Sequence, residues 1–278
     1  MYNINNVKLW ICNHKRDAKL SNYVSNPNYE VYNVYDEHEG KNIDNYNPFL
    51  SEYVLQYYVS ANNIKSELVG FCHYSKIIDI ANIKNYSNNP EHFLYYDIIK
   101  LRTNGFFAIN CKQYSFVRRQ INEYGGPNTF YFDVCEYLNK QKIVDTAFIQ
   151  QYTEIYEVPF IACELYVIDW DGFIKLTKFI NGYLDFIYKK YNIDSFESFR
   201  DHIDKYAITY YRKYTSLYKG DYCKSCYQYY DKFKTIFDED GGLGKNNCWR
   251  QYAYIIEILV SIFLAVYLKQ DCKNLELY

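Results

Sequence analysis

The sequence predicts an α/β fold: a central, mostly parallel sheet flanked by helices, with a helical C-terminal part. Short apolar runs of strand length alternate along the chain with longer stretches in which apolar residues recur at helical spacing. Hydrophobic residues make up 49% of the 278 positions, which is enough for a sizeable core and excludes a disordered chain. Because no repeat or low-complexity linker divides this pattern, we expect a single domain over residues 1–278.

The first quarter of the chain predicts three strands and one helix. Two strands are expected at Val7–Cys12 and Glu30–Val34, with a polar loop between them. Apolar residues then recur at helical spacing through Leu50–Asn62, and Pro48 stands near the start of this helix. A third apolar run, Leu68–Phe71, is typical of a buried strand.

The rest of the chain continues the alternation. Strands are expected at 106–110 and 160–168, and helices at 114–124, 129–151 and along the face from Phe173 to Ile187. From about 195 to 244, Tyr interleaves with Lys and Arg, and we expect a helical insertion there. Such a tract can bind an acceptor, stack on bases or serve only as structural helices. An acceptor-binding subdomain and plain helices are the two favoured alternatives.

Composition excludes several classes of function. A net charge of −2 gives no electrostatic footprint for nucleic acid, so no such partner is expected. The 36 tyrosines are explained by an A+T-rich genome or by surfaces that bind sugars or partners, and both explanations stay open. Nine cysteines without a secretory signal favour reduced thiols and a cytoplasmic location.

The apolar stretch 252–268 is expected to be a buried helix. It contains Glu257 and is shorter than the roughly 20 residues of a membrane span. Peripheral attachment to the inner face of a membrane is left open.

The third strand ends in a cluster of reactive side chains. Cys72, His73, Tyr74, Ser75 and Lys76 follow its apolar residues directly. In open α/β sheets, ligands bind beyond the carboxyl ends of the strands. The cluster is therefore the first candidate for a functional site.

Several motifs of this sequence resemble the signature of a known family. The matching segments are Ser51-Glu52, Tyr57-Tyr58, Asn62 and Gly70-Phe71-Cys72-His73-Tyr74, followed more weakly by Val7–Lys15, Pro159–Asp169 and Arg250–Leu259. The family that these segments resemble is a domain of unknown function found among bacterial capsule, exopolysaccharide and lipopolysaccharide synthesis proteins, and it is itself similar to the GT-A glycosyltransferases. The likeness runs from residue 7 to 268. It implies a GT-A-like, Rossmann-like fold and a glycosyltransferase that moves a sugar from a nucleotide sugar, with a UDP-sugar favoured, to a glycan acceptor.

The resemblance also suggests how the leaving diphosphate is bound. GT-A enzymes usually hold a divalent metal there with an Asp-x-Asp motif, as a Lewis acid. The Cys72–Lys76 cluster falls at that place in the chain and contains no carboxylate, so fixed positive charge is expected instead. Lys76 and Tyr74 are candidates for binding the diphosphate, and His73 is a candidate catalytic residue. A purely structural role of His73 and Tyr74 in the core is the alternative.

Two acidic segments are further candidates. Asp169 and Asp171 form a literal Asp-x-Asp after a predicted strand, and carboxylates suit Mg²⁺ or Mn²⁺. A helix cap is the favoured role for this pair, so no metal is assigned with certainty. Contact with sugar or acceptor is a further role for both, as it is for Glu164, because the strand that contains Glu164 resembles the one lining the donor sugar in GT-A enzymes.

The C-terminal segment supplies the candidate base. Glu257 is the one charged residue in its apolar stretch, and burial of a carboxylate requires a partner or a raised pKa that would suit a general base. Arg250 is a candidate donor contact or a structural partner of Glu257. His14 and Lys15, after the first strand, resemble nucleotide contacts, with a solvated turn as the alternative. A non-catalytic carbohydrate-binding or scaffold protein on the same fold is the rival to the glycosyltransferase.

Overall fold

The computed structural model describes residues 7–14, 20–74, 77–78, 128–141, 164, 166–203, 205 and 251–271. The predicted mixed α/β architecture is confirmed in these residues. Four strands form one sheet in the order β2-β1-β3-β4, with β1 parallel to β2 and β3, and β3 antiparallel to β4. Their bounds are Val7–Asn13 (β1), Tyr29–Asn33 (β2), Leu68–His73 (β3) and Tyr166–Asp169 (β4). The sheet is therefore mostly parallel, as expected.

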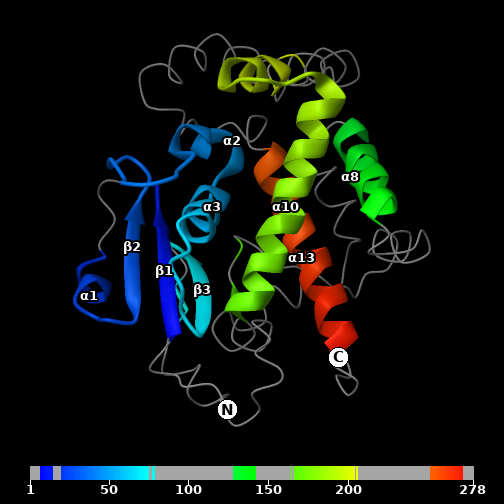
Figure 1. Cartoon of the computed structure of the whole chain (residues 1–278). Helices are drawn as coiled ribbons and strands as arrows, with labels where there is room; N and C mark the ends of the chain where they lie inside the picture. Colours follow the sequence, from blue (N-terminus) through cyan, green and yellow to red (C-terminus); the bar gives the residue numbers. More distant parts are fainter. Residues whose placement is uncertain are drawn as a thin grey trace, which may run out of the picture.

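Helices α3, α10 and α13 lie on the same side of the sheet (Figure 1). Helix α10 packs on β3 and β4, and α13 packs on α10. The helix bounds are Ser21–Val24 (α1), Asn47–Leu50 (α2), Tyr53–Ala61 (α3), Asn128–Gln141 (α8), Trp170–Tyr191 (α10) and Gln251–Asp271 (α13), with a 3₁₀ turn at Asp44–Tyr46. Apolar side chains of both the sheet and these helices join one buried cluster.

The helix expected at Leu50–Asn62 is two helices with a break at Ser51. Ser51 has φ of 51°, outside the helical region, so α2 ends at Leu50 and α3 begins at Tyr53. The apolar spacing continues across the break, because Leu50, Tyr53 and Val54 are all buried, and it therefore concealed the break from the sequence. The break matters for the site because it places Glu52 at the N-cap position of α3.

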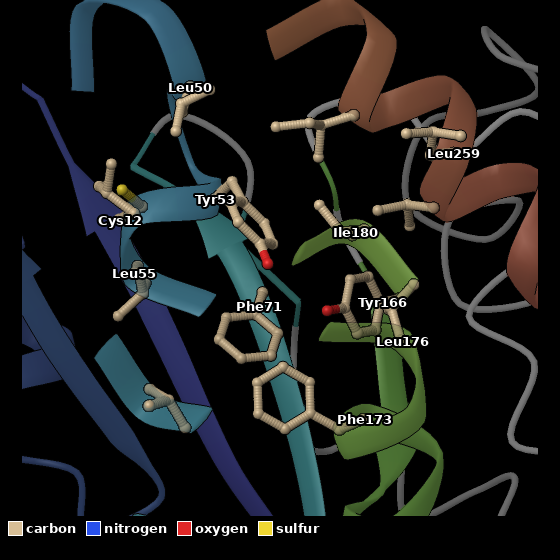
Figure 2. Packing of buried hydrophobic residues seen from close by; sticks show 14 of the residues in the cluster. Cys12, Leu50, Tyr53, Leu55, Phe71, Tyr166, Phe173, Leu176, Ile180 and Leu259 are labelled. Atoms are coloured by element: carbon tan, nitrogen blue, oxygen red, sulfur yellow. The ribbon is translucent and has the colours of Figure 1, made fainter. Parts of the chain in front are cut away.

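Helix α10 confirms the predicted apolar face. Its buried residues lie between Gly172 and Ile187 and recur at helical spacing, and Phe173 packs its ring on Phe71 of β3 (Figure 2). The side chain of Asp169 accepts a hydrogen bond from the backbone N–H of Gly172 at 2.8 Å, and Asn192 ends the helix in the left-handed conformation. A cap at each end thus fixes where α10 starts and stops.

Three predicted elements agree only in part or lie outside the described residues. The strand expected at 160–168 is observed from Tyr166 to Asp169, and Glu164 before it has a positive φ of 49°, which is incompatible with a continuous strand there. Helix α8 covers the first part of the predicted 129–151 helix. The strand expected at 106–110, the helix at 114–124 and residues 206–244 of the Tyr-rich tract lie outside the described residues.

The C-terminal helix α13 confirms the buried helix expected at 252–268. Its residues Tyr252, Ile256 and Leu259 are fully buried, and Phe263 packs against Phe179 of α10. Within the described part of the chain, every helix is too short or too polar to cross a membrane. The side chains of three cysteines are described, Cys12, Cys72 and Cys135, and these three are thiols that form no disulfide.

His202 predicts a loss of stability in acid. Burial, and then the charge of Lys205, lower the pKa of His202 to about 4. Its Nε2 atom lies 2.8 Å from the hydroxyl of Tyr252. Below the ordinary pKa of about 6.5 the unfolded chain binds a proton that the folded protein does not, so stability falls between about pH 6.5 and pH 4 and then levels off. Because His202 is partly exposed, solvent screens its charge, and we expect a loss of about 1–2 kcal/mol in the free energy of unfolding.

Urea unfolding of the protein and of the variant His202→Gln between pH 7 and pH 4 measures this effect. The Gln amide can keep the contact with Tyr252 but does not titrate. We expect the protein to lose about 1–2 kcal/mol more than the variant over this range. Equal losses in the two proteins would contradict the assignment to His202.

Candidate functional site

The strand order defines the place where a ligand is expected. The chain runs from β1 to β2 on one side of β1, and then returns to place β3 on the other side. Such a reversal of direction makes a topological switch point, and ligands of open α/β sheets bind there, beyond the carboxyl ends of the strands. His14 follows β1 directly and His73 ends β3, in register with Cys12. The parallel pairing therefore brings two predicted site residues to the switch point.

A carboxylate lies between the two histidines. The Oε1 atom of Glu52 is 3.3 Å from Nε2 of His14 and 3.6 Å from Nε2 of His73. His14 and Glu52 are buried, and His73 is the most exposed of the three, with 15% of its side chain accessible. We refer to His14, Glu52 and His73 as the His–Glu–His cluster.

Two neighbours orient the histidine rings. The amide of Asn47 meets Nδ1 of His14, with Nδ2 at 3.0 Å and Oδ1 at 3.3 Å, and Asn47 Nδ2 also donates to the backbone carbonyl of Ser51 at 3.2 Å. The ring of Tyr74 lies against the ring of His73, with centroids 4.1 Å apart. The backbone N–H of Tyr74 donates a hydrogen bond to the carbonyl of Cys12. Helix α2 and the end of β3 therefore hold the cluster from two directions.

A second buried polar group lies one turn further along α3. Gln56 donates a hydrogen bond to Glu164 and accepts one from the hydroxyl of Tyr166 at 2.7 Å. Burial, and next the negative charge of Glu164, raise the pKa values of Tyr53 and Tyr166 well above 10, so both hydroxyls stay protonated. Glu164, expected as a sugar contact, is fully buried and bound by Gln56.

The Asp-x-Asp pair lies at the opposite end of the strands from His73. Because β4 is antiparallel to β3, Asp169 pairs with Leu68 at the start of β3 and not with His73 at its end. Five residue steps at about 3.3 Å each put roughly 16 Å between these two ends. Asp169 caps α10, which confirms the helix cap that the sequence favoured for this residue, and Asp171 is exposed in the first turn of that helix. The pair does not fit a metal centre that also involves His73.

Four predicted site residues remain: Glu257, Lys15, Lys76 and Arg250. Glu257 lies half-buried on α13, a helix that packs against α10 and α2. Lys15, Lys76 and Arg250 lie outside the described residues, so their predicted roles stay predictions. A hollow of 580 Å³, bordered by α1 and β2, extends to Asn13, the residue before His14.

Glu52 had no predicted role of its own, although Ser51-Glu52 is one of the segments that resemble the glycan-synthesis family. Another signal was available, since Glu52 is the one charged residue between Asp44 and Lys65 in an otherwise apolar and polar-neutral helical stretch. Asn47 and Gln56 carried no comparable signal. Comparison of the chain with protein-family models, with curated proteins and with solved structures finds no match.

Proposed function

We propose that this protein is a glycosyltransferase with a GT-A-like fold that uses a nucleotide-sugar donor, with a UDP-sugar favoured, and a glycan acceptor. The observation that carries the proposal is the meeting of His14 and His73 at the switch point of a mostly parallel sheet. The resemblance of the Gly70–Tyr74 segment to the glycan-synthesis family supports it independently of the geometry. The fold by itself would not imply the reaction.

The cluster suits the charge that develops in glycosyl transfer. When the glycosidic bond to the donor breaks, negative charge grows on the departing diphosphate and must be neutralised. The partly exposed His73 would supply an imidazole at that position, with the Glu52 carboxylate 3.6 Å from its Nε2 atom. The neighbouring Tyr74 offers a ring and a hydroxyl group for the donor. Glu257 on α13 remains the proposed base for the acceptor hydroxyl, and its half-buried position is compatible with that role.

A donor screen tests the function. Thermal unfolding of the full chain is measured with UDP, GDP, CDP and ADP, and hydrolysis of the corresponding nucleotide sugars is followed with and without EDTA. We expect one nucleoside diphosphate to stabilise the protein and its sugar conjugate to be slowly hydrolysed. His73→Ala and Glu257→Ala are expected to remove hydrolysis while the far-UV circular dichroism is retained.

His38→Ala is the matched control, since His38 stacks on Tyr32 outside the cluster and is expected to leave hydrolysis unchanged. If no nucleotide shifts the unfolding temperature and no donor is hydrolysed, the chain is not a transferase. The rival, a carbohydrate-binding or scaffold protein, would then be the better description.

A further inference from the structure

The His–Glu–His cluster is built like a metal centre. Among the residues that the structure describes, it is the one group of three histidine, cysteine or acidic side chains whose ligand atoms all lie within 4.8 Å of one another. Two imidazoles with one carboxylate, plus an open position, form a ligand set found in catalytic zinc sites. We propose that His14, Glu52 and His73 bind one Zn²⁺-like divalent transition-metal ion at the switch point.

The distances fit tetrahedral coordination. Metal–ligand bonds of about 2.0–2.1 Å in a tetrahedron hold neighbouring ligand atoms roughly 3.3–3.4 Å apart. The two separations from Oε1 of Glu52, 3.3 Å and 3.6 Å, lie close to this value, and the third pair of ligand atoms, from His14 and His73, lies within 4.8 Å. Octahedral coordination with bonds of about 2.0–2.1 Å would need neighbouring ligands at roughly 2.9 Å. Small side-chain movements therefore suffice for a tetrahedral ion, without any rearrangement of β1 or β3.

The surroundings of His14 suit a ligand histidine. A metal-bound imidazole typically donates its second ring N–H to a fixed acceptor, which sets the tautomer. The carboxamide oxygen of Asn47 lies 3.3 Å from Nδ1 of His14, and it can accept that N–H while Nε2 faces the metal. The opposite tautomer suits the metal-free state, because Asn47 Nδ2 lies 3.0 Å from Nδ1 and can donate to it while the Nε2 proton is directed to Glu52. Asn47 serves both tautomers because its amide carries a donor and an acceptor.

The donor atoms decide which ion is favoured. Imidazole nitrogens select zinc and its transition-metal neighbours, whereas Mg²⁺ and Ca²⁺ prefer all-oxygen sites. Because the cluster supplies three protein ligands, a tetrahedral ion would keep a fourth position for a water molecule or a phosphate oxygen. Binding of the ion rests on this geometry alone. A role of the ion in neutralising the donor diphosphate would rest on the proposed glycosyl transfer.

Metal binding to the full chain, freed of metal by chelation, tests the proposal. Isothermal titration with Zn²⁺ and elemental analysis after dialysis are expected to show one tightly bound ion per chain. Co²⁺ is expected to give the intense visible bands of four-coordinate cobalt, without the thiolate charge-transfer band that cysteine ligands produce. Glu52→Gln is expected to weaken Zn²⁺ binding by about 100-fold or more, and Asn47→Ala by about 10-fold to 100-fold, since it orients a ligand.

Two controls separate this site from other zinc-binding groups. Replacement of both Cys223 and Cys226 by Ser removes the C-x-x-C of the sequence, and Glu30→Gln removes an exposed carboxylate of β2. Both variants are expected to keep the high-affinity site. Equal affinity in Glu52→Gln and the unchanged protein, or loss of binding in the cysteine variant, would overturn the proposal and leave the cluster as a hydrogen-bonded trio. Metal binding without donor hydrolysis would retain the site and remove only the proposed transferase.

Discussion

Gly70→Val is expected to destabilise the protein by about 3 kcal/mol or more, at the upper end of the cost of overpacking a core. Gly70 lies in the middle of β3, paired with Leu9 of β1 on one side and with Val167 of β4 on the other. A Cβ atom at this position would come within 2.5 Å of Leu9 Cδ2 and 2.8 Å of Val167 Cγ2, and 3.1 Å from the carbonyl oxygen of Tyr166. The side chains of Leu9 and Val167 must therefore shift, and the backbone of Tyr166 must yield slightly, to accept any side chain here.

Urea unfolding monitored by circular dichroism measures this loss. Glu30→Val is the matched control, because it introduces the same side chain at an exposed position of β2 and is expected to change stability by less than about 0.5 kcal/mol. Val167→Ala in the Gly70→Val background is expected to restore part of the stability, since it removes one of the clashing groups. If the double variant is no more stable than Gly70→Val alone, the clash with Val167 is not the cause.

The strands and main helices were predictable because each is encoded by a local pattern. The runs around Leu9 and Phe71 are apolar on both faces, as a sheet buried on both sides requires, and the face of α10 repeats at helical spacing. The break at Ser51 was not predictable, because apolar spacing reports which residues are buried and continues unchanged across a kink. The antiparallel direction of β4 is likewise a tertiary property with no local signal.

The site was predictable only in pieces. His14 and His73 were recognised because both follow apolar strands, yet they were given separate roles, as nucleotide contact and catalytic residue. Their meeting depends on the parallel pairing of β1 with β3, which joins residues 59 positions apart. Glu52 joins them through the break between α2 and α3. The expectation of a diphosphate site without carboxylates came from reading Cys72–Lys76 alone, and the structure adds a carboxylate to it from another element.

Gln56→Leu is expected to destabilise the protein by about 3–4 kcal/mol, because it removes two buried hydrogen bonds, one of them to a charged group. Gln56 and Glu164 are both fully buried, and Gln56 joins the Glu164 carboxylate to the hydroxyl of Tyr166. Leu has nearly the same volume as Gln, so little of the loss should come from packing. Gln141→Leu, an exposed change at the end of α8, is the control and is expected to lie within about 0.5 kcal/mol of the unchanged protein.

A double-mutant cycle identifies the origin of this loss. Glu164→Met replaces the buried carboxylate by an unbranched apolar side chain, which the positive φ at this position tolerates as well as it tolerates Glu. If desolvation of the carboxylate is the cost of Gln56→Leu, the double variant should be more stable than Gln56→Leu alone, since replacing both members of a buried polar pair is less costly than replacing one. Additive losses would mean that Gln56 acts through Tyr166 instead. Because Gln56 lies one turn from Glu52 on α3, retained zinc affinity in the double variant would further show that the buried pair supports the fold without setting the geometry of the His–Glu–His cluster.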